Sequence, residues 1–265
     1  MSFLEQVIDT SLRIPGVKVD RNSFLRDQFK IYYSEETILK AIEMNPSFAG
    51  IPGSGINRIA KSTIKNHVRV ASVASFVAGL PGGLAMLGTI PADMAQFYAN
   101  VVILAQKLAY LYGWPDFNDK NDSEVLKDMI TLFLGVMFGV AQANKVMAEV
   151  SRRLAVEVTK RVPNKALTKY AWYNILKKLA KWLGIKLTKD SFAKGLAKAI
   201  PIIGGLLSGG MTYVSMNNMA KRLIKQLESG ELFTAVNTTE NINPDEIIIV
   251  DGISDVELAE DNEDR

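Results

Sequence analysis

Residues 80–117, LPGGLAMLGTIPADMAQFYANVVILAQKLAYLYGWPDF, are the stretch that decides the fold. They join an apolar run, broken by proline and glycine, to a long segment whose apolar residues have helical spacing. Thr89 is placed to cap the helix, and Pro91 falls in the first turn, where its missing N–H costs no helical hydrogen bond. Gly113-Trp114-Pro115 ends the pattern. The segment therefore predicts a helix over residues 93–112 behind a broken apolar hairpin.

The rest of residues 1–228 has the same helical spacing, and no alternating strand pattern of useful length occurs. Proline and glycine mark the ends of the segments. We predict an all-α protein, a multi-helix bundle with apolar helical hairpins that are broken by glycine and proline. The expected helices cover residues 1–12, 20–44, 57–79, 93–112, 123–161, 165–183 and 189–199, with a last helix that ends near residue 227.

Charge divides the chain into two parts. The net charge of the 265 residues is only +3, but residues 229–265 hold 11 acids and one base. Residues 1–228 keep 30 bases and 17 acids, a net charge of +13. We therefore predict a basic helical domain over 1–228 and an acidic, mostly disordered tail over 229–265. A basic body favours an anionic partner. Deleting the tail should leave the fold intact and strengthen binding to anionic surfaces.

Two uncharged runs, residues 70–92 and 199–220, are long enough to span a bilayer. Each has proline and paired glycines near its middle, which divide it into pieces that suit a buried hairpin or a re-entrant segment. We favour burial in a core over membrane insertion. No signal peptide is predicted, because no basic stretch precedes an apolar one at the N-terminus. The expected location is cytoplasmic, with peripheral attachment to the inner face of the cell membrane as an option.

Cysteine and histidine, two common catalytic and metal-binding residues, are nearly absent from the chain. The chain has no cysteine and one histidine, His67, which excludes thiolate chemistry and the usual zinc sites. Residues 50–55 have the glycine spacing of a phosphate-binding loop but lack its Lys-Ser/Thr pair and a preceding strand. We assign no catalytic residue, no metal and no cofactor. His67 is expected on a helix surface.

A polar stripe marks the predicted 93–112 helix, where Asp93, Gln96, Asn100 and Lys107 fall within about 60° of one another. In a functional interpretation the stripe faces a cavity, with Asp93 as an acid or an ion ligand. In a structural interpretation it is a solvated face, with Asp93 favoured in the first turn by the helix dipole. We favour the second, because surface helices commonly look like this.

A basic amphipathic helix is predicted over residues 165–183. Tryptophan on an apolar arc opposite lysine is typical of a helix that lies in a membrane interface, although the same arc also suits packing on a core. Nucleic acid is a less favoured partner, because no recognition motif accompanies the charge. The candidate membrane-interface residues are Lys169, Trp172, Lys177, Lys178, Lys181 and Trp182.

One apolar island interrupts the acidic tail and has strong strand propensity. It suits addition as a strand to the sheet edge of a partner, but also an intrachain strand or an apolar island without a partner, and we favour the latter two. Its residues are Ile247, Ile248, Ile249 and Val250.

Several of these motifs together resemble the EcsC family of bacterial proteins. The likeness covers roughly residues 55–227 and is carried by Leu80-Pro81-Gly82-Gly83, by Thr89-Ile90-Pro91-Ala92-Asp93, by residues 103–113 and by Ala199-Ile200-Pro201 with the glycines that follow. The family is named for an ABC-transporter operon. The resemblance implies a helical protein, cytoplasmic or membrane-associated, without an established activity, and it carries over no catalytic residue.

The expected function is that of a non-enzymatic bacterial accessory protein at the cytoplasmic face of the membrane or on a membrane complex such as a transporter. Its expected partner is an anionic membrane surface or a membrane protein complex. Two alternatives stay open: an enzyme or small-molecule binder with an apolar pocket near Asp93, and a membrane-permeabilising effector whose hairpins insert on a trigger. The sequence predicts no substrate and no oligomeric state.

Overall fold

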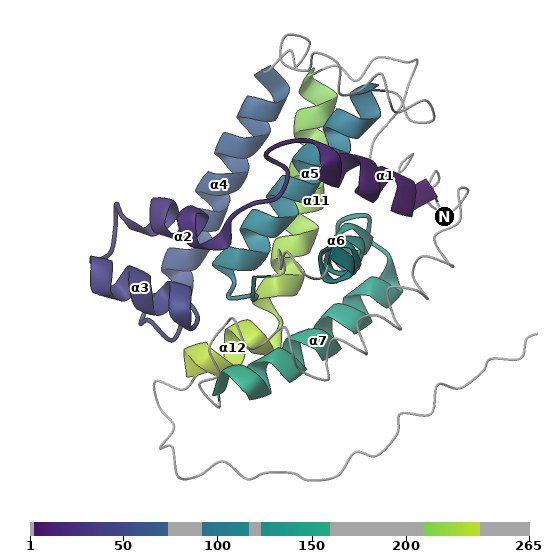
Figure 1. The fold of residues 1–265 in the computed structure, drawn as a ribbon. Helices are drawn as coiled ribbons and strands as arrows, with labels where there is room; N and C mark the ends of the chain where they lie inside the picture. Colours follow the sequence, from purple (N-terminus) through teal and green to yellow (C-terminus); the bar gives the residue numbers. More distant parts are fainter. Residues whose placement is uncertain (1–2, 74–91, 117–122, 160–208, 239–265) are drawn as a thin grey trace, which may run out of the picture.

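The computed structural model describes residues 3–73, 92–116, 123–159 and 209–238. All regular secondary structure in these ranges is helical, which confirms the predicted all-α class. The helices are α1 (Phe3–Arg13), α2 (Arg21–Phe29), α3 (Glu35–Glu43), α4 (Gly53–Val73), α5 (Ala92–Leu111), α6 (Ser123–Met137), α7 (Ala141–Thr159), α11 (Gly209–Glu228) and α12 (Glu231–Thr238), shown in Figure 1.

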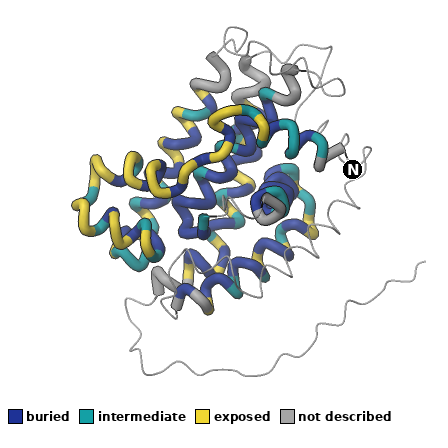
Figure 2. The backbone as a smooth tube through the Cα atoms, in the orientation of Figure 1, coloured by how far each residue is buried: buried dark blue, intermediate teal, exposed yellow. Residues whose placement is uncertain are grey.

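Helix α5 is the centre of the molecule. It packs against α1, α2, α4, α6 and α11. From Phe97 onward its residues are buried, apart from the partly exposed Ile103 and Lys107 (Figure 2). A helix that is apolar on nearly all sides is stable only when other helices surround it. The segment that decides the fold therefore supplies its central helix.

The other helices pack around α5, some alongside it and some across it. Helices α4, α5 and α11 lie side by side, and α1 packs across α5 and α6 (Figure 1). Helix α7 packs on α6 and on α12, at the lower edge of the view in Figure 1. The pair α2–α3 lies at the other side, beside the first turns of α4. The two ends of the bundle therefore present different helices to the surroundings.

The end of α5 follows the sequence prediction. Gly113 has a φ of +86°, in the left-handed region that favours glycine. The Trp114 N–H donates to the Ala109 carbonyl over 3.0 Å, and the Gly113 N–H donates to the Tyr110 carbonyl over 3.2 Å. This pair of bonds is the Schellman arrangement that satisfies the last carbonyls of a helix.

The predicted helix over residues 123–161 is wrong in one respect, because it is two helices. Gly139 has a φ of +78° and ends α6. The Val140 N–H donates to the Gly135 carbonyl and the Gly139 N–H to the Val136 carbonyl, each over 2.9 Å. This is a second Schellman arrangement. It turns the chain from α6 into α7.

The predicted helix over residues 20–44 is also broken. Residues 30–34 form a turn between α2 and α3. Ser34 caps α3, because its hydroxyl accepts a hydrogen bond from the Thr37 N–H, and Asp20 caps α2 in the same way through Ser23. The bond from Ser23 holds the pKa of Asp20 below its usual value. The break creates the α2–α3 corner on which the candidate site depends.

Helix α12 corrects the predicted start of the acidic tail. Its residues were expected to belong to a disordered segment, but Leu232 and Phe233 are buried and the helix packs along α7. The Ser151 hydroxyl of α7 accepts a hydrogen bond from the Leu232 N–H over 2.9 Å, which satisfies a free amide in the first turn of α12. The body therefore extends to the end of α12.

Several predictions fall on residues outside the described ranges. These are the helices at 165–183 and 189–199, most of the two apolar runs, and the tail beyond residue 238. The part of the second run that belongs to α11 is described, and Ser215, Met216, Met219 and Ala220 are buried there. Within the described ranges, none of the helices combines the length and hydrophobicity of a membrane-spanning segment.

Candidate functional site

The exposed face of α4 is strongly basic. Arg58, Lys61, Lys65 and Arg69 are all exposed. At 100° per residue they fall within about 80° of one another, and at 1.5 Å per residue they extend over about 16 Å. The opposite side of α4 is apolar and buried in the core, which turns these four side chains outward. The buried residues of that side are Ile56, Ile59, Ala60, Ile64 and Val68.

We call these four residues the cationic face, and no acid of the described part of the chain pairs with them. Residues 44–92 contain no aspartate or glutamate. None of the four cations forms an ion pair with another described residue. Like charges along one helix face repel one another, so the arrangement costs stability rather than adding it. Such a face suits an anionic partner.

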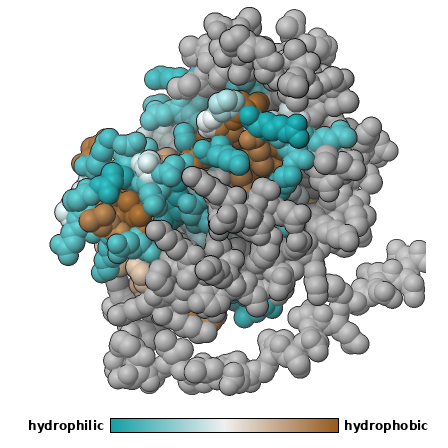
Figure 3. Space-filling view, in the orientation of Figure 1, coloured by the Kyte–Doolittle hydropathy of each residue, from teal (hydrophilic) through white to brown (hydrophobic). Residues whose placement is uncertain are grey.

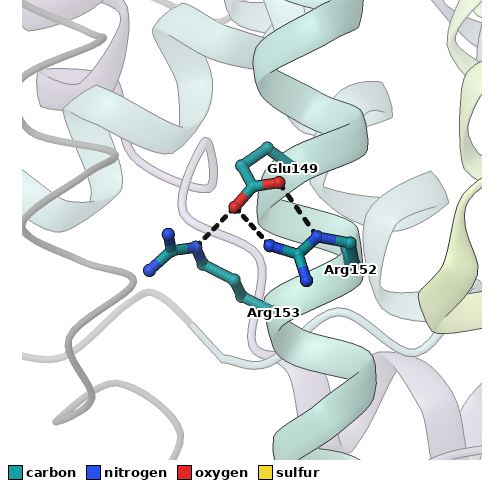
Figure 4. Close-up of polar contacts among 3 residues, drawn as sticks. All are labelled: Glu149, Arg152 and Arg153. Atoms are coloured by element: carbon teal, nitrogen blue, oxygen red, sulfur yellow. Dashed lines mark hydrogen bonds and ion pairs between the residues drawn. The ribbon is translucent and has the colours of Figure 1, made fainter. Parts of the chain in front are cut away.

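Helix α7 provides the contrast. Glu149 lies between Arg152 and Arg153, with oxygen–nitrogen distances of 2.9 and 2.6 Å (Figure 4). The hydrogen bond from Arg152, and then that from Arg153, holds the pKa of Glu149 below its usual value although partial burial opposes them. The basic residues of α7 are therefore partly compensated, whereas those of α4 are not.

Large apolar side chains are exposed beside this face, on the α2–α3 corner. The exposed fractions are 74% for Ile31, 54% for Tyr32 and 43% for Leu39. Figure 3 shows apolar residues gathered at this end of the molecule within a hydrophilic surrounding. Solvent exposure of such side chains gains nothing for folding and often marks an interaction surface when several occur together. We call these three residues the apolar corner.

A cavity connects the apolar corner to the cationic face. It has a volume of about 200 Å³ and is lined by Tyr32 of the apolar corner, by the neighbouring Tyr33, and by Gly55, Arg58 and Ile59 from α4. Arg58 is also the first cation of the basic face. The apolar corner and the cationic face therefore meet at this cavity, through Tyr32 and Arg58.

The apolar corner is held in place by a buried cation. Arg21 is 1% exposed, and its guanidinium donates to the carbonyls of Ile42, over 2.7 Å, and Trp114, over 3.2 Å, with a longer bond to Ala41. Burial lowers its pKa to about 10, so it keeps its charge at neutral pH. The bonds satisfy carbonyls at the end of α3 and after α5, where no helical partner exists. They fix α2 and α3 against the core.

The polar stripe was expected to face solvent, and the structure shows that its described part is only partly exposed. Asn100 is 8% exposed, and its side-chain amide donates to the Gln96 carbonyl over 3.0 Å. Gln96 is partly buried, and the Lys107 ammonium lies 5.9 Å from the centre of the Phe24 ring of α2. Asp93 lies in the first turn of α5, and its side chain is outside the described part. Asn100 is buried, and Gln96 and Lys107 are partly covered, because α2 and α4 pack over this face.

His67 was expected on a helix surface, and this expectation is wrong. The ring lies between α4 and α5, where Nε2–H donates to the Asn100 carbonyl over 2.9 Å. Burial, followed by the positive charge of Lys107, lowers its pKa to about 4. The ring is therefore neutral at neutral pH, and it acts as a packing and hydrogen-bonding residue beneath the cationic face.

The described residues give no group of three or more His, Asp or Glu side chains that is arranged to hold a metal ion. The candidate residues of segment 165–183 and of the apolar island at 247–250 lie outside the described ranges. No family model, no curated protein and no solved structure matches the chain. The resemblance to the EcsC family rests on its motifs and stays a prediction.

The cationic face was missed by the sequence analysis, although its signal is present. Bases at positions 58, 61, 65 and 69 have the spacing of one helix face, in the longest part of the body without an acid. The apolar corner has no comparable signal. Ile31, Tyr32 and Leu39 look like core residues until the break between α2 and α3 is known.

Proposed function

We propose that the protein is a non-enzymatic bacterial accessory protein that works at the cytoplasmic face of the membrane, and that it binds the anionic membrane surface through α4 and the α2–α3 corner. One observation carries the proposal: four cations without acidic partners among the described residues border exposed apolar side chains on one surface. The predicted basic helix at 165–183 is a second proposed contact with the same surface.

The magnitudes favour such binding. A lysine or arginine close to an anionic bilayer contributes about 1 kcal/mol, so four contribute about 4 kcal/mol, or roughly a thousandfold increase in binding. Ile31 and Leu39 add burial of apolar area in the headgroup region. Stable peripheral attachment generally needs two signals of different kinds, and this surface offers both.

The apolar corner also favours a membrane over nucleic acid. Aliphatic side chains such as Ile31 and Leu39 have no role on a phosphate backbone, whereas a bilayer surface accepts them. Binding of single-stranded RNA to the same face, with an affinity above that for anionic vesicles, would contradict the proposal.

A pair of charge reversals tests the proposal. Lys61 on α4 and Lys145 on α7 are both exposed lysines on helices, so Lys61→Glu and Lys145→Glu make the same change in net charge at different places. Sedimentation of the full chain with phosphatidylglycerol vesicles measures the affinity. We expect Lys61→Glu to lower this affinity about thirtyfold, because two charge units at about 1 kcal/mol each are lost. Lys145→Glu should change the affinity less than about threefold, because it acts only through long-range electrostatic interaction with the vesicle.

Vesicles of phosphatidylcholine alone should bind neither variant nor the unaltered chain. Equal loss in the two variants would show that only total charge matters, and would remove α4 as the binding face. Failure of the unaltered chain to sediment with anionic vesicles would overturn the proposed function.

A further inference from the structure

We propose that the cavity between the α2–α3 turn and the first turns of α4 binds a phosphomonoester group, with Arg58 and Tyr33 as its donors. This inference deepens the proposed function and rests on it for the source of the ligand. A phosphomonoester reaches the cavity either as a lipid headgroup or as a free solute, and the experiment below separates the two.

The size of the cavity sets the class of ligand. Its volume of about 200 Å³ is below the roughly 300 Å³ at which pockets for drug-sized molecules begin. A phosphate group with a short attached chain fits this space, whereas a nucleotide is too large. Ile59 and the ring of Tyr32 supply apolar wall for the attached carbon atoms.

The polar groups of the cavity are free to donate. Arg58 is exposed and forms no ion pair with a described residue, and the Tyr33 hydroxyl forms no hydrogen bond with one. A guanidinium donates to two phosphate oxygens at once, and a tyrosine hydroxyl can donate to a third. Edge-on contact with Phe29, at 5.9 Å between ring centres, restrains the Tyr33 ring before any ligand arrives.

Gly55 shows how closely the hydroxyl approaches α4. A Cβ atom at position 55 would stand 2.5 Å from Tyr33 Oη, so any other residue would displace the hydroxyl. Glycine within a helix is unfavourable by itself. Its presence here is explained by the close approach that forms one wall of the cavity.

The α4 side of the cavity favours a doubly charged ligand. The cavity opens at the N-terminal end of α4 and of its cationic face, and residues 44–92 contain no acid. A phosphomonoester carries a charge of about −1.5 to −2 near neutral pH and has three terminal oxygens. The phosphodiester of an ordinary headgroup has one charge and two terminal oxygens. The donor set therefore selects the monoester.

Two arginines on the same face provide a matched pair of variants. Arg58→Gln and Arg69→Gln each remove one charge from the cationic face of α4, but only the first alters the cavity. Vesicles with phosphatidic acid and vesicles with phosphatidylglycerol are prepared at equal surface charge. The unaltered full chain should bind phosphatidic acid about tenfold more tightly, as expected for charge-assisted hydrogen bonds.

Arg58→Gln should reduce that preference to less than about twofold, and Arg69→Gln should keep it. Both variants should lower the affinity for phosphatidylglycerol vesicles equally. Tyr33→Phe removes the hydroxyl and Gly55→Ala displaces it, so each should give an intermediate preference while Arg58 remains. Titration of the full chain with glycerol 3-phosphate tests binding of a free solute, and the NMR resonance of the Gly55 amide reports that binding. A shift of that resonance without a vesicle preference identifies the solute as the source.

The outcomes separate the inference from the proposed function. Binding to both vesicles without a preference, together with no response to glycerol 3-phosphate, overturns the phosphomonoester site and leaves membrane binding in place. A preference that Arg58→Gln does not reduce also overturns the site. No vesicle binding, with a glycerol 3-phosphate response that Arg58→Gln abolishes, supports the site and overturns the proposed function.

Discussion

His67 lies between α4 and α5, and its neutral form is part of the native structure. In an unfolded chain a histidine has a pKa of about 6.5, whereas burial here lowers the pKa to about 4. Lys107 is the charged group that faces it from α5, and it opposes protonation further. Between these two pKa values the unfolded chain binds more protons than the folded one. The contribution of the neutral ring to the free energy of unfolding is therefore fully present above pH 6.5. It is lost as the pH falls towards 4.

Replacement of His67 should make the free energy of unfolding depend less steeply on pH. Between pH 7 and pH 4 the free energy of unfolding should fall by about 2 kcal/mol more in the unaltered chain than in His67→Gln, after a discount for the part of the ring that solvent reaches. Urea unfolding at a series of pH values measures the difference. Parallel pH profiles for the two chains would contradict a buried neutral histidine.

Arg21 shows the limit of sequence reasoning at this scale. A charged residue in a helical segment is normally taken as exposed, because charges are rarely buried without partners. Its partners are backbone carbonyls of Ala41, Ile42 and Trp114, far away in the sequence. Backbone acceptors leave no pattern in the amino-acid sequence. The residue that fixes the apolar corner was therefore not predictable, whereas the glycine that ends α5 was.

Helix α12 belongs to the body, and two truncations test this. A chain that ends at Thr238 loses only residues beyond α12, and its free energy of unfolding should change by less than about 0.5 kcal/mol. A chain that ends at Gly230 also loses the burial of Leu232 and Phe233, at about 2 kcal/mol each, so it should lose about 4 kcal/mol. Equal stability of the two chains in urea would show that α12 contributes nothing to the fold.

Element boundaries explain most of the differences between the predicted and observed fold. Helical spacing predicted the helices correctly where proline or glycine separated them, as at residues 14–16 and 113–115. The turn after α2 is marked only by the capping residue Ser34, and the end of α6 only by an isolated glycine. A single glycine is tolerated inside a helix, so it does not predict a break by itself. Local patterns were therefore read as longer helices than the chain forms.

The candidate site was predictable in part for a related reason. The cationic face of α4 needs only the spacing of four bases on one helix, which the sequence contains. The exposure of the apolar corner depends on how α2 and α3 are turned against α4. That arrangement depends on Arg21 and on contacts between distant segments. The sequence shows the charge of the surface, and the fold adds its apolar part.

At the scale of the molecule, the proposed membrane surface lies at one end and the α7–α12 pair at another (Figure 1). Residues 1–228 carry a net charge of +13, and among the residues that the structure describes the basic side chains are unevenly paired with acids. On α7, Glu149 neutralises part of it, whereas the face of α4 keeps all four of its cations without acidic partners in the described part. The proposed orientation on a membrane therefore rests on where charge is uncompensated rather than on net charge.

The most direct measurement uses the absence of cysteine in the chain. Single replacements Ile31→Cys on the apolar corner, Ser62→Cys on α4 and Gln142→Cys on α7 all lie at exposed positions and accept an environment-sensitive fluorophore. With anionic vesicles, the label at residue 31 should shift to the blue and that at residue 62 should become shielded from an aqueous quencher, while the label at residue 142 stays unchanged. Equal responses at the three positions, or a response at residue 142 alone, would contradict binding through α4 and the α2–α3 corner.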